Sequence, residues 1–573
     1  MFSERFVFWL KLAAIALFGL VLFRYFANEE PYPTGDGIEY ILTTEAWKNH
    51  ASPDIRPTDY CSFKADFLKH QTWESNYKRT AFDEVEQFLN EKPEIRKEYG
   101  GFYRSSSGKV YGYHFVFYSL VNVPSRALVS WLNVHPIKAF LYTNLLFWLG
   151  FFAWILFGSA KQLMKNVFLL GILFFGGSFY YCAWTHPESL TCVLVGLSLW
   201  LLLQKKFHGA LLFCALATLQ NQPICFLLLW MFLVVAWEYK FKVINLLIYP
   251  LYGAIAFLPS LYFYVLFGTT SLIKDAGFLS TDNVTLPRVL GFFLDLNQGM
   301  VLGIGLFLFL YFGLWVRRVW QIVQTRKFDP WDLMPFVVLA ITLLVACMNN
   351  WNHGMAIINR YAVWVEVMVL MHVFVLLGDW NTRIKASLVT LCGVSQLTLL
   401  YIHLPWNRFD WSNIQHMPLA KWAMRYDPTM YNPDPQIFIA RTNQVFDFTK
   451  NASPVFYFDE HNRLKKVAVH ANHVDTLRYF GYVPKALNQY ASARSGKELW
   501  YYINDFEQRS TKSSQEVLSL IKQSELLRIL NEMSANPQWM ESLQKKATQN
   551  KCSRNEQMHQ DAEFIFNERH ALH

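Results

Sequence analysis

Long apolar runs, separated by short polar segments, dominate the chain up to about residue 404. A helix needs about 20 mostly apolar residues to cross a bilayer. We identify eleven such runs and predict a polytopic α-helical membrane protein. The predicted spans lie near residues 6–26, 137–158, 166–184, 187–203, 208–221, 223–237, 243–267, 299–316, 331–348, 360–378 and 384–403. The runs at 208–221 and 223–237 are short, and we expect them to be tilted or only partly spanning.

The first apolar run, FVFWLKLAAIALFGLVLF, follows Arg5. A cleaved signal peptide is the alternative interpretation of such a run. This run is long, however, and it is followed by Arg24, Tyr25 and Phe26 rather than by a cleavage site of small residues. We therefore predict a retained spanning helix.

The loops on one side of the predicted spans are all basic. The short turns at 185–188 and 220–223 contain no Lys or Arg. Every loop on the other side is basic, which places those loops and the N-terminus in the cytoplasm by the positive-inside rule. The basic residues of these loops are Lys161, Lys165, Lys205, Lys206, Lys240, Lys242, Arg317, Arg318, Arg326, Lys327, Arg383 and Lys385.

The loop of residues 27–136 is the first of two large regions predicted outside the cytoplasm. It shows helical periodicity around residues 62–98. Residues 115–132 form an amphipathic stretch with Arg126 on its polar side, which is typical of a helix that lies along a membrane surface. This loop belongs with the spans, and we assign residues 1–404 to one transmembrane module.

The second region, residues 405–573, has the composition of a soluble domain. The segments PDPQIFIART and SPVFYFDEHNRLKKVAVH favour strands, the second with a turn at Asp459–Asn462. Residues 514–548 favour helices. We predict a small C-terminal α/β domain.

Composition supports the membrane class. Hydrophobic residues make up 53% of the chain and charged residues only 17%, compared with about 25% charged residues in typical globular proteins. The net charge of +9 is distributed over short clusters between apolar runs, so we expect no nucleic-acid partner. The eight cysteines have no metal-binding spacing.

Polar and ionisable residues collect on the predicted outer face. Because such groups are costly at membrane depth, they tend to mark a functional cavity. Five separate segments contribute them, and we expect their side chains to form one site. They are Asp36, Glu39 and Glu45 after the first span, His114 late in the outer loop, His186 and Glu188 in WTHPES, Asp295 and Asn297 in FFLDLNQGM, and His353 and Arg360 in NNWNHGMAIINRY.

Each of these residues also has a purely structural interpretation. Asp36 lies in GDG and suits a turn. The segment with His186 and Glu188 suits a helix start, and Asp295 suits a helix N-cap. Arg360 suits an anchor to lipid headgroups, and His114 suits an interfacial histidine. The convergence of the segments favours a site.

Three short motifs resemble those of the GT-C superfamily of integral-membrane glycosyltransferases, which includes protein O-mannosyltransferases and the aminoarabinose transferases of lipid A. TGDGIEY places an aspartate soon after the first span, as in that family. SGKVYGYHFVFYSLVNVP keeps His114 and Pro124 but has Phe and Tyr where the family often has Pro-Gly. WNHGMAIINRY keeps Trp351, Gly354, Arg360 and Tyr361 but lacks other glycines. DLNQGMVLG resembles a further element, and the resemblance covers roughly residues 1–405.

The resemblance implies an inverting transferase in a bacterial inner membrane, with its site and C-terminal domain in the periplasm. A polyprenyl-phosphate-linked sugar is the implied donor, a hydroxyl of a glycan, lipid or protein is the acceptor, and membrane lipids surround the chain. The implied general base is Asp36, with Glu188 as a second acidic residue. Arg360 and His114, with Lys109 or Arg288, would hold the donor phosphate. Glu39, His186, Asp295 and His353 would line the sugar and acceptor pocket.

We expect no obligatory cofactor. A divalent metal is compatible with this chemistry, but no clustered Asp-x-Asp supports one. Two alternatives stay open. An O-antigen ligase or polymerase also handles polyprenyl-linked sugars, although its large loop usually comes late among the spans. A transporter would be expected to show internal repeats and polar residues at the membrane midplane, and we find no convincing repeat.

Overall fold

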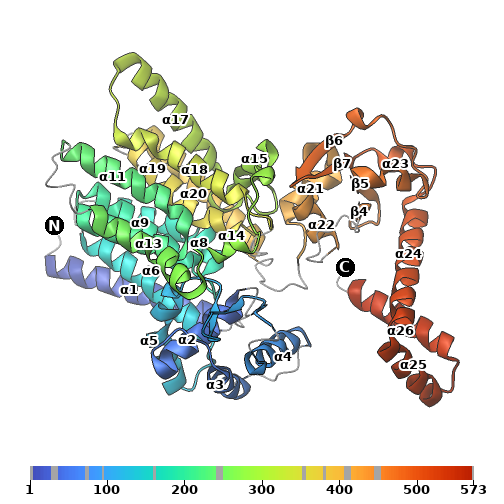
Figure 1. Ribbon diagram of the computed structural model, residues 1–573. Helices are drawn as coiled ribbons and strands as arrows, with labels where there is room; N and C mark the ends of the chain where they lie inside the picture. The colour runs from blue at the N-terminus through green and yellow to red at the C-terminus, as the bar shows by residue number, and fades with distance from the viewer. Residues whose placement is uncertain are drawn as a thin grey trace. The chain divides into compact units, whose positions relative to one another are not determined.

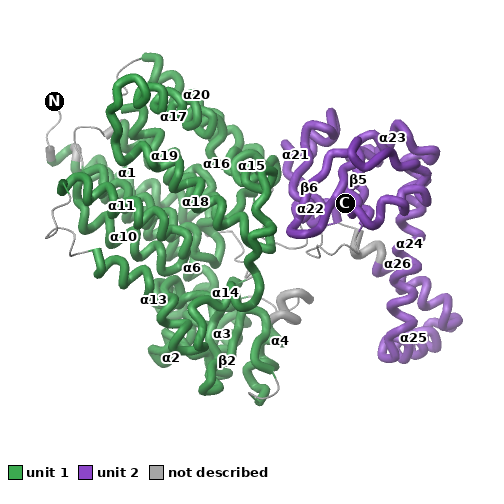
Figure 2. The backbone as a smooth tube through the Cα atoms, turned by 45° about the horizontal axis from the view of Figure 1, so that its top comes forward, with its two compact units in different colours: residues 1–410 green, residues 411–573 purple. Residues whose placement is uncertain are grey.

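The structure is a computed structural model that describes residues 4–27, 36–70, 76–92, 96–158, 163–240, 249–351, 357–378, 383–404, 414–443 and 453–570. The described chain is mostly helical (Figure 1). It divides into two compact units, residues 1–410 and 411–573, which Figure 2 distinguishes by colour.

Among the described residues of the first unit, six helices are long and apolar enough to cross a membrane. This confirms a helical protein with several helices suited to membrane insertion. The six are α1 (Glu4–Ala27), α6 (Lys138–Gly158), α13 (Tyr249–Phe267), α17 (Leu306–Thr325), α19 (Arg360–Leu377) and α20 (Arg383–His403).

The remaining predicted spans coincide with shorter apolar helices. These are α7 (Leu163–Phe174), α9 (Glu188–Leu203), α10 (Phe207–Gln220), α11 (Cys225–Glu238) and α18 (Met334–Ala346). Two predicted spans are interrupted rather than continuous. The span near 166–184 ends as the short helix α8 (Gly177–Tyr181), and the span near 299–316 begins as α16 (Val301–Ile304) before Gly305, whose φ is 52°. A positive φ favours glycine, which explains the break at that residue.

Glu366 of α19 lies where these two interrupted segments meet. Its side chain is buried, and its Oε2 accepts a hydrogen bond of 2.8 Å from the backbone N–H of Gly177. The first N–H groups of a helix have no partner within the helix, and such a group is costly in an apolar environment. Glu366 therefore stabilises the start of α8, and the backbone of Gly303 in α16 packs directly against its carboxylate.

Replacing Gly303 by alanine is expected to destabilise the protein by about 1–3 kcal/mol, the usual cost of overpacking a filled interior. The new Cβ would overlap the Glu366 carboxylate, which the Gly177 N–H holds in place. Thermal unfolding in detergent measures the effect. Gly313→Ala in α17 is the matched control, because its Cβ meets nothing within 4 Å. Equal melting temperatures for the two variants would contradict the packing argument.

The region between α1 and α6 combines helices with a small sheet. Its helices are α2 (Gly37–His50), α3 (Pro57–Leu68), α4 (Asn76–Asn90) and α5 (Phe117–Trp131). The predicted helical periodicity up to residue 98 ends earlier, at Asn90. An antiparallel sheet of β1 (Glu98–Tyr99), β2 (Phe102–Arg104) and β3 (Val110–Gly112) follows and leads directly to His114. The alternation in these strands is too short to detect in the sequence.

The helix α5 confirms the predicted amphipathic stretch and shows how it is oriented. Its polar residues Ser119, Asn122 and Arg126 are buried in the protein, whereas Leu120 and Trp131 are exposed. Arg126 pairs with the buried Glu45 of α2 and with Asp66 of α3. The polar face of α5 therefore joins α5 to two neighbouring helices, and its apolar face is left on the surface.

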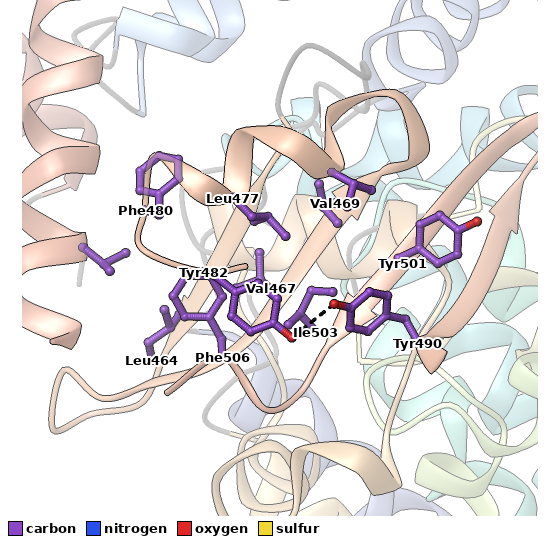
Figure 3. Close-up of a cluster of buried hydrophobic side chains, with 12 residues drawn as sticks. Leu464, Val467, Val469, Leu477, Phe480, Tyr482, Tyr490, Tyr501, Ile503 and Phe506 are labelled. Atoms are coloured by element: carbon purple, nitrogen blue, oxygen red, sulfur yellow. Dashed lines mark hydrogen bonds between the residues drawn. The ribbon is translucent and has the colours of Figure 1, made fainter. Parts of the chain in front are cut away.

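The second unit contains a four-stranded antiparallel sheet in the order β4-β5-β7-β6. Its strands are β4 (Val455–Phe458), β5 (Leu464–His470), β6 (Ala491–Ser495) and β7 (Glu498–Ile503). Buried side chains including Val467, Leu477, Ile503 and Phe506 form its core, as Figure 3 shows. The strands β4 and β5 pair antiparallel on either side of the turn at Asp459–Asn462. This confirms the strands and the turn predicted for SPVFYFDEHNRLKKVAVH.

One expectation for this unit is wrong. The segment PDPQIFIART forms the helix α22 (Pro435–Asn443), not a strand. Its residues 435–441 are all buried, so the run lacks a polar face that would reveal its period. Pro435 is the first residue of the helix, a position that proline favours. The predicted C-terminal helices are confirmed as α24 (Ser514–Ala535) and α25 (Pro537–Asn550), followed by α26 (Arg554–His570).

Candidate functional site

Six of the predicted site residues come together, and we call them the Asp36 cluster. They derive from four chain segments that are far apart in the sequence. Asp36 and Glu39 lie at the start of α2, His114 follows β3, His186 and Glu188 lie at the start of α9, and Arg360 is the first residue of α19. The N-terminal ends of three helices therefore meet here. Such ends present unpaired N–H groups and favour negative charge.

Asp36 occupies the centre of the cluster. Its Oδ2 accepts a hydrogen bond of 2.9 Å from Nη1 of Arg360, and it lies 3.8 Å from Nε2 of both His114 and His186. Asp36 is the N-cap residue of α2, but its side chain makes no capping hydrogen bond. The side chain therefore serves the contact with Arg360 rather than the local turn that its sequence context favours.

Glu39 holds His114 in a defined orientation. Its Oε2 lies 3.0 Å from Nδ1 of His114, and its Oε1 accepts the His114 backbone N–H at 2.5 Å. A Cβ on Gly101 would lie 2.8 Å from Glu39 Oε2, and one on Gly112 would lie 2.5 Å from Oε1. The two glycines thus let the β1–β3 sheet approach the carboxylate closely. As a result, the Nε2 of His114 is directed toward Asp36.

The start of α9 supplies the third part of the cluster. The ring of His186 stacks on Trp184, with ring centroids 3.5 Å apart and planes 6° apart. Glu188 Oε1 lies 3.9 Å from Nε of Arg360. Within the described residues, neither Arg360 Nε nor Glu188 Oε2 has a hydrogen-bond partner, although both atoms are buried. Buried polar atoms are nearly always paired, so these two atoms mark a place suited to a ligand group.

The charges of the cluster shift the pKa values of its members. Burial alone would raise the pKa of Asp36, but the positive charges of His114 and Arg360 outweigh burial and hold that pKa well below its usual range. Burial would lower the pKa of His114, but the carboxylates of Glu39 and Asp36 raise it. Burial lowers the pKa of His186 well below its usual value. At neutral pH Asp36 is therefore an ionised carboxylate.

Other residues named from the sequence lie outside this cluster. Lys109 is exposed, and its Nζ lies 3.8 Å from Asp54. Arg288 is buried, and its Nη1 donates to the carbonyls of Ala346 and Met348. Glu45 is the buried partner of Arg126. His353 lies outside the described residues.

Asp295 is the C-cap residue of α15 (Leu286–Leu294), not an N-cap. Its Oδ1 accepts the backbone N–H groups of Asn297, at 2.7 Å, and Gln298, at 3.0 Å, which is an Asx turn. The carbonyl of Gln298 in turn accepts the N–H of Asn359, at 2.8 Å. The turn therefore lies beside the residue that precedes Arg360, one step removed from the cluster.

The Asp36 cluster is also surrounded by residues that were not predicted from the sequence. The ring of Tyr40 lies against those of His114 and His186, with centroids 5.3 and 5.6 Å away, and its hydroxyl accepts a hydrogen bond of 3.1 Å from Gln220 Nε2. Tyr40, Trp184 and Gln220 all lie inside segments that were already singled out, namely TGDGIEY, WTHPES and the turn at 220–223. Proximity to a predicted site residue is the one signal that identifies them.

A metal site has no support from the arrangement of ligands. In the part of the chain that the structure describes, no group of three or more His, Cys, Asp or Glu side chains is placed to hold a metal ion. The cluster instead combines one partly exposed carboxylate with an arginine and two histidines, an arrangement suited to proton transfer and anion binding.

No model of a known protein family matches this chain, and neither does any curated protein or solved structure. The fold and the cluster define the class: a helical protein with apolar helices long enough to cross a membrane and an ionisable cluster where three helices begin. The function is therefore inferred from the geometry of the cluster together with its motifs.

Proposed function

We propose that this chain is a membrane glycosyltransferase of the GT-C type. It moves a sugar from a polyprenyl-phosphate donor to an acceptor hydroxyl of a glycan, lipid or protein. The observation that carries the proposal is the pair of Asp36 and Arg360, joined at 2.9 Å where the N-terminal ends of α2, α9 and α19 meet. A base and a phosphate-binding group are the two parts that this reaction requires.

Asp36 is the general base in this proposal because it is the accessible carboxylate of the cluster. Its side chain is 30% exposed, whereas those of Glu39 and Glu188 are each 2% exposed. Glu39 is also occupied by two contacts with His114. An acceptor hydroxyl can thus reach Asp36. The buried Oε2 of Glu188 has no hydrogen-bond partner among the described residues and would accept a hydrogen bond from a hydroxyl of the bound sugar.

Arg360 and His114 are the proposed ligands of the donor phosphate. Arginine binds phosphate through two parallel hydrogen bonds, and Arg360 Nε has no partner among the described residues. The raised pKa of His114, caused by the Glu39 and Asp36 carboxylates, favours its cationic form. The helix ends add further N–H groups that favour an anion. His186, and the turn formed by Asp295, would border the sugar.

Donor binding would activate the base. Arg360 pairs with Asp36, and this contact keeps the carboxylate weakly basic. A phosphate competes with Asp36 for the same guanidinium. As Arg360 turns toward the phosphate, Asp36 loses part of its positive surroundings, and its pKa rises. The carboxylate therefore becomes a stronger base when the donor is bound.

The proposed reaction is a single displacement. The acceptor hydroxyl oxygen forms a bond to the anomeric carbon while its proton moves to Asp36. The bond between that carbon and the phosphate oxygen breaks, and its electron pair stays on the phosphate. The products are an inverted glycoside and the polyprenyl phosphate, whose charge Arg360 and His114 stabilise.

The topology that accompanies this proposal has eleven spans and a cytoplasmic N-terminus. Asp36, the cluster and the C-terminal unit then lie on the periplasmic side of a bacterial inner membrane. The basic loops support this orientation, and the apolar helices support membrane insertion.

A panel of polyprenyl-phosphate sugars tests the proposal. The purified full chain is reconstituted in liposomes, and release of polyprenyl phosphate is measured for each donor with glycan, lipid and protein acceptors. At least one donor is expected to be consumed. If every donor and acceptor combination is inactive while the protein remains folded, the glycosyltransferase proposal is wrong.

Arg360→Lys is expected to raise the KM for the donor by about 10- to 100-fold, because hydrogen bonds to charged groups contribute about 1.5–3 kcal/mol each. Lysine keeps the charge but cannot form the paired contact. Initial rates over a range of donor concentrations measure the change.

Arg360→Gln is the matched variant without charge. Removing the cation from Asp36 raises its pKa, so the acidic limb of the profile of kcat/KM against pH is expected to move to higher pH. In Arg360→Lys that limb should stay near its original position. If neither variant changes the donor KM or the pH profile, Arg360 does not hold the donor phosphate.

A further inference from the structure

The first helix of the second unit, α21 (Pro418–Tyr426), carries an exposed apolar face. Trp422 is 57% exposed, Tyr426 is 68% exposed, and Met430, just beyond the helix, is 72% exposed. Trp422 and Tyr426 are four residues apart and therefore lie on one side of the helix, with ring centroids 5.7 Å apart. We call Trp422, Tyr426 and Met430 the α21 face.

The opposite side of α21 is fixed to its own unit. Ala420, Ala423 and Met424 are buried, and the helix packs against β5. The α21 face is therefore held outward by the fold and cannot turn inward without loss of the packing beneath it. Large exposed apolar surfaces of this kind mark sites of interaction with a partner.

We propose that the α21 face lies in the headgroup region of the membrane that α20 crosses, with lipid as its partner. Trp and Tyr are the residues enriched at membrane interfaces, because their rings are apolar and their N–H or O–H groups remain hydrated. This proposal does not depend on glycosyl transfer.

The connection to α20 argues for lipid over a separate protein partner. α20 ends at His403, where Tyr401 is 81% exposed, as expected for an aromatic residue at a membrane boundary. Only residues 404–417 separate α20 from α21. A chain of this length reaches at most about 50 Å when fully extended. A linker of this length keeps the α21 face within reach of the bilayer surface.

Site-directed spin labelling of the full chain in lipid nanodiscs tests the proposal. Cys61, Cys225, Cys347 and Cys552, the cysteines that are not buried, are first replaced by serine. One label is placed at Met430→Cys, and the control label is placed at Ser524→Cys, an exposed position in α24. Accessibility to oxygen, which concentrates in lipid, is compared with accessibility to a water-soluble nickel complex.

The label at Met430→Cys is expected to show an oxygen-to-nickel ratio several-fold above that at Ser524→Cys. Adding Trp422→Ser and Tyr426→Ser should return the ratio to the control value, with an unchanged melting temperature showing that the unit remains folded. Nickel access equal to the control would overturn the proposal. Protection from both reagents would also overturn it, because it would show that protein covers the face.

Discussion

Asp36→Asn is expected to reduce the rate of sugar transfer by about 10²- to 10⁴-fold, the usual contribution of a general base. Asparagine keeps the size of the side chain and can still accept a hydrogen bond from Arg360, but it cannot take a proton at neutral pH. The effect should appear in kcat, because the base acts in the transition state rather than in donor binding. Initial rates in liposomes, with a donor that the wild-type chain consumes, measure it.

Asp54→Asn is the matched control for this result. Asp54 is a buried carboxylate of the same loop, and it also has an arginine partner, Arg56 at 3.0 Å, but it lies outside the Asp36 cluster. Its substitution is expected to leave the transfer rate unchanged. If Asp36→Asn retained the full rate while remaining folded, Asp36 would not be the base, and the exposed fraction of a carboxylate would be a poor guide to its role.

The sequence predicts where the helices of this chain lie, but it does not predict where they are interrupted. Apolar runs in the sequence locate every described helix that is long and apolar enough to cross a membrane. The interruptions before α8 and at Gly305 are not visible in hydropathy, since one or two glycines change the mean of a long apolar window only slightly. They depend on tertiary partners such as Glu366, whose carboxylate accepts a hydrogen bond from the Gly177 N–H at the start of α8. Such partners are distant in sequence.

The candidate site, too, can be predicted only in part from the sequence. Asp36, His114, Glu188 and Arg360 can be named from the sequence, because they are ionisable residues in segments predicted to lie on the outer face, close to apolar runs. Which of them are neighbours cannot be read from it, because residues 36 and 360 are far apart in the sequence and meet only where the starts of α2, α9 and α19 come together in the fold. Lys109 lies in a segment that resembles a GT-C motif, yet its side chain lies beside Asp54 and outside the Asp36 cluster. Tyr40 was missed because a tyrosine near a span is commonplace.

Arg126→Met is expected to lower the free energy of unfolding by about 3–5 kcal/mol, the usual cost of breaking a buried ion pair from one side. The side chains of Arg126 and Glu45 are 2% and 1% exposed. Without Arg126, Lys48 at 2.9 Å is the one described cation left to balance the buried charge of Glu45. Denaturant titration in mild detergent measures the loss.

Two further variants distinguish the effect of the buried Arg126–Glu45 ion pair on stability from that of an ion pair on the surface. Lys205→Met breaks an ion pair with Glu238 of 2.9 Å, but both side chains are exposed, so its expected cost is about 1 kcal/mol or less. The double variant Glu45→Leu with Arg126→Met removes both buried charges. It should recover much of the stability lost in Arg126→Met, because no buried carboxylate is then left without its arginine partner. If the single and double variants were equally unstable, packing of the Arg126 stem, not its charge, would be what holds α5 to α2. Since α2 also carries Asp36 and Glu39 at its start, the same comparison shows whether the ion pair or the packing keeps the cluster in place.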